Sequence, residues 1–253
     1  GFPCQDFSVA GKRKGFNSHK THKNKVELDA PTIESRGMLY YWLREAIGII
    51  KPKIFIAENV KGLVSMGEVK EVIANDFRTT GGGYVVLEPR VLHAGDYGVP
   101  QSRERVIFIG VRKDLLGNET IQKLLNNELE LYPMPTHDAK SDFVSAKDAI
   151  FDLCEPEASS DVAHQKYSKA KYYGRHCQGQ TEINPHALAP TIRSEHHGNI
   201  EFRRLSKENG GLIKDEYDLP QRRLSVRECA RIQTFPDDYR FVTNEVAASE
   251  AYK

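Results

Sequence analysis

Four side chains near the amino-terminal half have the chemistry of a nucleophilic active site. Cys4 lies in the loop sequence Gly-Phe-Pro-Cys-Gln, and a thiolate is a soft nucleophile that is partly ionised near neutral pH. Glu58 follows an apolar run at residues 54–57, where a carboxyl group can act as an acid. Arg103 and Arg105 alternate along an extended segment, so both point to one side and can face one anionic centre.

The elements that must position these side chains alternate between helix and strand. Apolar residues at helical spacing predict one helix before Pro52 and a second between Val69 and Phe77, which a triple glycine at residues 81–83 ends. The run at residues 54–57 predicts a strand covered on both faces, and residues 84–92 and 106–111 predict two more strands. The order predicts an α/β fold with a partial Rossmann-like, mostly parallel sheet. Ligands bind beyond the carboxyl ends of such strands, where Cys4 and Glu58 are expected.

Past about residue 131 the periodicity weakens, and His, Ser and Pro become frequent. Two helix starts stand out in this region. Ser145 is followed three residues later by Asp148, and Ser225 by Glu228, and each pair has the pattern of a capping box. The second start predicts a helix over residues 227–235 that Pro236 ends.

The bulk composition excludes several classes of protein. The 36 Lys and Arg residues nearly balance the 35 Asp and Glu residues, so only local basic clusters can indicate nucleic-acid binding. Four scattered cysteines without a Cys-x-x-Cys pair predict reduced thiols, no metal site and a cytoplasmic protein. No apolar run reaches the length of a membrane span.

Five segments of the sequence contain short motifs. The segments are Gly1-Phe2-Pro3-Cys4-Gln5 with the basic loop Gly11 to Gly15, Ser35-Arg36-Gly37 with Leu39 and Tyr40, Glu58-Asn59-Val60, Gln101-Ser102-Arg103-Glu104-Arg105, and Arg223 to Gln233 with Phe235-Pro236-Asp237. Any one of them could arise by chance, but the ordered set is specific. In this order the segments resemble one family, the DNA cytosine C5-methyltransferases.

The resemblance implies methylation of C5 of a cytosine in a short duplex DNA site, with S-adenosylmethionine as the methyl donor. The base would be flipped out of the duplex, Cys4 would attack C6, Glu58 would assist at N3, and Arg103 and Arg105 would hold the base and the site. Pro3 and Leu39 are expected to contact the donor. The expected DNA-binding residues are Gln5, Ser8, Lys12, Arg13, Arg193, His197, Asn199 and Arg203.

The resemblance also implies a division into parts. We expect a partial catalytic domain at residues 1–130, a target-recognition domain at 131–222, and a bracing helix at 223–253 that returns to the catalytic domain. The family's Gly-rich donor-binding loop and its closing motif are not found in the sequence. We therefore expect an internal fragment, or one piece of a two-chain enzyme whose complementing chain carries the missing motifs, with weak donor binding by this chain alone.

Two other functions remain open at this point. The first is the tRNA-directed branch of the same family, although a recognition region of this length favours duplex DNA. The second is a DNA-binding remnant without catalysis. The resemblance favours a methyltransferase that protects DNA beside a restriction endonuclease.

Overall fold

The computed structural model describes residues 1–2, 38–66, 68–137, 142–174, 176–194, 199–241 and 247–252. The chain forms two compact units. The first comprises Gly1–Leu92 and Glu104–Met134, and the second comprises His93–Arg103 and Pro135–Lys253. Among the described helices, none combines the length and hydropathy that crossing a bilayer requires.

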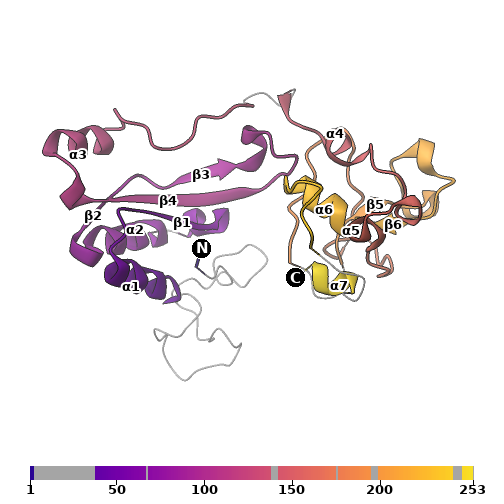
Figure 1. The fold of residues 1–253 in the computed structure, drawn as a ribbon, viewed down its shortest axis with the longest axis horizontal. Coiled ribbons are helices and arrows are strands. Elements are labelled where there is room, and N and C mark those ends of the chain that lie inside the picture. Colours follow the sequence, from indigo (N-terminus) through magenta and orange to yellow (C-terminus); the bar gives the residue numbers. More distant parts are fainter. Residues whose placement is uncertain are drawn as a thin grey trace, which may run out of the picture. The chain divides into compact units, whose positions relative to one another are not determined.

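The first unit is built on a small sheet of four strands (Figure 1). The strands are β1 (Ile54–Val60), β2 (Tyr84–Val86), β3 (Arg90–His93) and β4 (Glu104–Arg112). The order is β1-β4-β2, and β3 also pairs with β4. β1 lies antiparallel to β4 along its whole length, from Ile54 opposite Val111 to Val60 opposite Arg105.

The α/β class expected from the sequence is confirmed, but the strand directions correct the expectation of a mostly parallel sheet. β1 and β2 are each antiparallel to β4, so they run in the same direction as each other with β4 between them. A strand–helix–strand unit gives parallel strands, and β1, α2 and β2 obey that rule. β4 follows β2 in the sequence and runs in the opposite direction to β1 and β2. A hydrophobic run in the sequence does not reveal the direction of its strand.

Two helices cover one face of this sheet, α1 (Tyr40–Ile50) and α2 (Val69–Thr79) (Figure 1). Their buried side chains, among them Ile47 and Phe77, form one core with Phe55 of β1 and Phe108 of β4. The Phe55 and Phe77 rings meet edge to face with centroids 5.1 Å apart, a favoured aromatic geometry. The helical faces expected from the sequence therefore supply this core in part, since Trp42 and Ile50 of the first face remain 56% and 73% exposed.

The opposite face of the sheet is covered only in part. Helix α3 (Asn118–Leu125) and Tyr132 pack over β2 and β4. On β1, however, Ile54 and Ile56 are 56% and 68% exposed. The expectation that this strand is covered on both faces is therefore wrong for the described residues, since a continuous apolar run does not reveal which neighbours are present.

The second unit contains short elements around its own core. The core combines α4, α5 and α6 side chains with Ile183, Ile192 and Ile200. The elements are α4 (Ala146–Ile150), α5 (Val162–Gln165), α6 (Val226–Ile232), α7 (Ala248–Ala251) and the antiparallel pair of β5 (Phe202–Arg204) and β6 (Arg222–Arg223). Helix α6 ends three residues earlier than expected, before Thr234, which has a positive φ of 63°.

Both expected capping boxes are present. At α4 the Ser145 side chain accepts from Asp148 N, and at α6 the Ser225 side chain accepts from Glu228 N. The second box is buried and has a further partner, because Ser225 Oγ lies 2.8 Å from Nδ1 of the buried His164. The second box therefore joins α5 to the start of α6.

We expect Ser225→Ala to lower the free energy of unfolding by about 2 kcal/mol, because it removes a helix cap and leaves a buried histidine nitrogen without its partner. Ser145→Ala, at the solvent-facing box, is the matched control and should cost about 0.5–1 kcal/mol. Urea denaturation of both variants measures the difference. Equal losses would contradict the role given to His164.

Candidate active site

The first unit brings two of the expected catalytic residues together. Arg105 Nε lies 2.7 Å from Glu58 Oε1. The ladder explains this contact, because Arg105 is opposite Val60 and Glu58 is two residues earlier on the same face. The side chains of Glu58 and Arg105 are 41% and 23% exposed, so the pair is accessible to a ligand.

The start of the nucleophile segment lies against the same carboxylate. A Cβ atom on Gly1 would lie 2.7 Å from Glu58 Oε2 and 2.9 Å from the Glu58 carbonyl oxygen, so only glycine permits this approach. Phe2 is buried in the core, and its carbonyl oxygen accepts a hydrogen bond of 3.0 Å from Nδ2 of Asn59. The buried Asn59 thus ties the chain just before Cys4 to the end of β1.

Most of the other expected site residues near the amino terminus lie outside the described residues. Leu39 is described and is 9% exposed, so it is largely buried. Arg103 belongs to the second unit, where its carbonyl oxygen accepts from Ala94 N at 2.8 Å. Those that lie outside the described residues are Pro3, Cys4, Gln5, Ser8, Lys12 and Arg13, together with His197 of the recognition region.

Two of the expected DNA-binding residues lie close together in the second unit. Arg193 Nη1 donates to Glu201 Oε1 at 2.9 Å, and its Nη2 lies 3.5 Å from the Asn199 carbonyl oxygen. The Arg193 side chain is 29% exposed, whereas that of Glu201 is 3% exposed. The Arg193 side chain is therefore partly accessible, and the buried Glu201 carboxylate binds its guanidinium.

Arg203 requires a correction, because its guanidinium is used inside the protein. The residue is 5% exposed, pairs with both carboxylate oxygens of Glu216 at 3.0 and 2.8 Å, and stacks 3.6 Å over the Phe151 ring. A guanidinium committed in this way cannot also contact a phosphate or a base edge. We therefore remove Arg203 from the DNA-binding set.

Arg203 is part of a larger buried ionic network at β5, β6 and α6. Arg222 donates to both carboxylate oxygens of Glu228 at 2.8 and 2.9 Å. The Glu155 carboxylate forms salt bridges with Arg204 and Arg222. Burial opposes ionisation of Glu155, but the hydrogen bonds and charges of Arg204 and Arg222 outweigh it and lower the pKa of Glu155 to about 2. The basic character of residues 203–204 and 222–223 is thus internal to the second unit.

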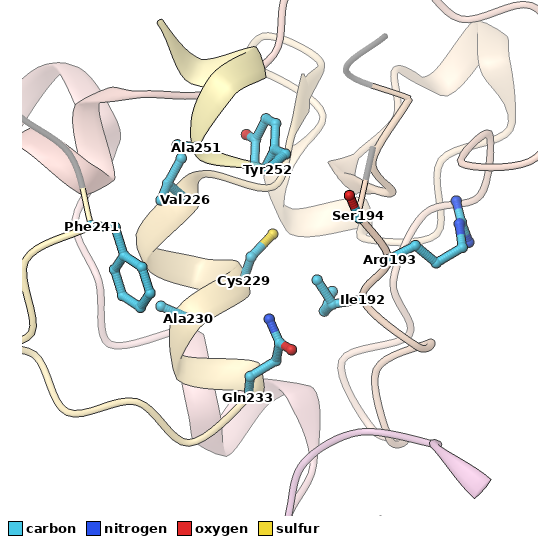
Figure 2. A pocket seen from close by; sticks show the side chains of 10 residues that line it. All are labelled: Ile192, Arg193, Ser194, Val226, Cys229, Ala230, Gln233, Phe241, Ala251 and Tyr252. Carbon is cyan, nitrogen blue, oxygen red and sulfur yellow. The ribbon is translucent and has the colours of Figure 1, made fainter. Parts of the chain in front are cut away.

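A cavity of about 210 Å³ opens beside α6 in the second unit (Figure 2). Cys229 of α6 and Gln233, the residue after this helix, line one wall and Ile192 lines the other. The thiol of Cys229 points into the space, while the Arg193 guanidinium points away from it (Figure 2). Burial raises the pKa of the Cys229 thiol well above its ordinary value, and the charges of Glu228 and Glu201 raise it further. This thiol stays protonated at neutral pH and is a poor nucleophile.

Two residues that matter for this geometry were not expected from the sequence. Glu201, which holds Arg193, is a single acidic residue in a polar stretch and has no local signal of burial. Arg223, at 1% exposure, donates hydrogen bonds to the carbonyl oxygens of Ala170, Lys171, Gly179 and Ile200. The sequence assigns Arg223 only to the motif over residues 223–233, which contains α6, because local sequence cannot show that one guanidinium binds carbonyl groups from three distant segments.

The described residues contain no group of possible metal ligands, and they include only one of the two residues expected at a methyl donor. In the part of the chain that the structure describes, no three His, Cys, Asp or Glu side chains are grouped to bind a metal ion. Of the two residues expected to contact a methyl donor, only Leu39 is described, and a single largely buried leucine does not make a binding site for a charged nucleoside. Binding of S-adenosylmethionine therefore stays a prediction.

Comparison with known proteins identifies the family of this chain. The C-5 cytosine-specific DNA methylase family matches residues 1–253. The chain belongs to this family.

Particular relatives agree with that assignment. The chain is 34% identical to the Type II methyltransferase M.BsuRI of Bacillus subtilis over 248 residues, 95% of this chain and 49% of the relative. It is 30% identical to the Type II methyltransferase M.HhaI of Haemophilus parahaemolyticus over 258 residues, 100% of this chain and 68% of the relative. The fold is similar to that of the S. pombe Dnmt2 methyltransferase, with a TM-score of 0.51 and 14% identity over 99% of this chain and 70% of that chain. The chain thus spans about half the length of some of its curated relatives.

Proposed function

We propose that this chain carries the base-activating residues and the target-reading region of an enzyme that methylates C5 of cytosine in a short duplex DNA site. The observation that carries the proposal is the contact of Glu58 with Arg105, together with the backbone of Gly1 against the same carboxylate. The order of motifs in the sequence supports the same reading. The names of the relatives, Type II methyltransferases, support a role in a restriction-modification system.

The chemistry requires a nucleophile because C5 of cytosine reacts poorly with electrophiles. Addition of the Cys4 thiolate to C6 would convert the C4–C5 bond into an enamine that can attack a methyl group. Cys4 follows Phe2 by two residues, and two extended residues span about 7 Å. The Phe2 carbonyl oxygen is bound by Asn59, so this short distance supports a role for the Cys4 thiol and the Glu58 carboxyl group at one pyrimidine ring.

Addition at C6 places negative charge on N3 of the ring, and a proton or a donor must stabilise that charge. Glu58 would supply it at N3, while Arg105 keeps the Glu58 carboxyl group in position and can donate to the O2 edge of the base. We include Arg103 among the residues that hold the base and the site only because it belongs to the motif at residues 101–105. The methyl group would come from S-adenosylmethionine, as the family resemblance implies. Loss of the C5 proton would then expel the Cys4 thiolate from C6 and restore the C5–C6 double bond.

Base flipping is needed because C6 of a stacked cytosine is inaccessible. The basic segment with Lys12 and Arg13 would contact the phosphates of the opened duplex, with Gln5 and Ser8 beside the extruded base. Arg193, His197 and Asn199 would contribute to reading the sequence. The proposal includes a complementing chain that carries the donor-binding motif.

The test is methyl transfer by the full-length protein, or by this chain with a complementing chain, to duplex DNA and to tRNA in parallel. Radiolabelled S-adenosylmethionine reports transfer, and bisulfite sequencing identifies C5-methylcytosine and its sequence context. We expect label in duplex DNA at one short motif. Label in tRNA alone would assign the chain to the RNA-directed branch, and binding of DNA without transfer to either substrate would indicate a non-catalytic protein.

A further inference from the structure

Three unsatisfied polar groups are concentrated around one arginine of the second unit. In the part of the chain that the structure describes, four buried side-chain nitrogen or oxygen atoms have no hydrogen-bond partner, and three of them belong to Gln180, Arg193 and Glu201. These residues come from two segments that meet closely, because a Cβ atom on Gly179 would lie 1.6 Å from the Asn199 carbonyl oxygen and 3.4 Å from Arg193 Nη2. Gly179 has a positive φ of 66°, so this position suits glycine alone.

Glu201 fixes the plane of the Arg193 guanidinium. One carboxylate oxygen binds Arg193 Nη1 at 2.9 Å, and the other, Oε2, is buried and has no hydrogen-bond partner among the described residues. A buried carboxylate with only one partner is costly for stability. A role in orienting the Arg193 guanidinium explains why Glu201 is present despite this cost.

The backbone under this pair is also fixed. Arg223 donates to the Gly179 carbonyl oxygen at 2.6 Å and to the Ile200 carbonyl oxygen. In the sequence, Gly179 precedes Arg193 and Ile200 follows it. The Arg223 guanidinium lies 4.0 Å over the Phe202 ring. The accessible edge of Arg193 is therefore presented by a preorganised surface, which lowers the entropy that binding must overcome.

We propose that Arg193 reads a guanine in the major groove of the DNA target, and that Glu201 is the positioning residue that fixes its guanidinium for this contact. The proposal rests on the function proposed above and deepens it. Two N–H groups in one plane match the O6 and N7 acceptors of guanine. A contact to phosphate needs charge but no fixed plane, so the buried carboxylate behind Arg193 favours the base.

The experiment compares the methylated motifs of four variants of the full-length protein with that of the unsubstituted protein. The probe is a library of randomised duplexes that surround a cytosine, read by bisulfite sequencing. The variants are Arg193→Gln, Arg193→Lys, Glu201→Gln and, as the matched control, Lys207→Gln, which removes an exposed cation from the same unit. A melting curve for each variant verifies that it is folded.

We expect Arg193→Gln and Arg193→Lys to relax the motif at one position that is guanine in the unsubstituted protein, with discrimination there reduced about tenfold to hundredfold. Glu201→Gln should relax the same position to a smaller extent, which a purely structural role would not produce. Lys207→Gln should leave the motif unchanged.

Other results overturn the proposal in distinguishable ways. An unchanged motif with a uniformly slower rate in Arg193→Gln, restored by Arg193→Lys, would identify a phosphate contact instead. Relaxation at a position other than guanine would exclude the assigned base. Failure of the unsubstituted protein to methylate any duplex would remove the proposed function itself, before any variant is compared.

Discussion

Cys4→Ala is expected to abolish formation of a covalent complex with DNA that contains 5-fluorocytosine and to reduce methyl transfer by several orders of magnitude. A nucleophile that forms the reaction intermediate cannot be replaced by a methyl side chain. The fluorinated base traps the intermediate because fluorine at C5 cannot leave as the proton normally does. A protein–DNA adduct that survives denaturing electrophoresis measures the effect.

Cys177→Ala is the matched control for this experiment. Cys177 is an exposed free cysteine in the second unit, and its replacement should leave the adduct intact. An adduct that persists in the Cys4→Ala protein would overturn the assignment of the nucleophile. Cys229 would not be the substitute, because its buried thiol stays protonated.

The second large effect is expected at the buried ionic network. Arg222→Met should lower the free energy of unfolding by about 3–5 kcal/mol, because it leaves the carboxylate of Glu228 buried with its principal partner removed. Glu228 is 0% exposed, so water cannot replace the lost guanidinium. Urea denaturation monitored by circular dichroism measures the loss.

Arg231→Met is the control for the network. Arg231 pairs with Asp152 and Asp237, whose side chains are 65% and 57% exposed, and surface pairs of this kind contribute about 1 kcal/mol or less. Similar losses for Arg222→Met and Arg231→Met would contradict the importance given to burial.

Acid should weaken the same network. The folded pKa of Glu155 is about 2, below its ordinary value of 4.5, so its stabilising contribution is complete above about pH 4.5 and is lost as the pH falls toward 2. Arg222→Met removes one of the two guanidiniums that lower this pKa, and it should therefore reduce the loss of stability between those pH values.

Local patterns in the sequence were sufficient for the helix starts and for part of the site. The capping boxes at Ser145 and Ser225 depend on residues three positions apart, and both are present in the structure. The contact between Glu58 and Arg105 joins residues 47 positions apart. It followed only from two ordered motifs, and spacing alone could not have predicted it.

Partners that are distant in the sequence explain where prediction failed. Arg203 resembles a surface cation beside Arg204, but Glu155 and Glu216 neutralise this pair inside the protein. The local sequence gives no sign of these carboxylates, which is why Arg203 was assigned to DNA. The direction of β4 relative to β1 was equally hidden, because an apolar run does not show in which direction its strand crosses the sheet.

The pairing of β1 with β4 limits where insertions and deletions can be tolerated in this protein. Glu58 and Arg105 share a face only because Val60 stands opposite Arg105. Inserting or deleting one residue within either strand would turn one of these two side chains to the opposite face of the sheet. Changes of length can therefore accumulate in the connecting segments, while both strands must keep a constant number of residues.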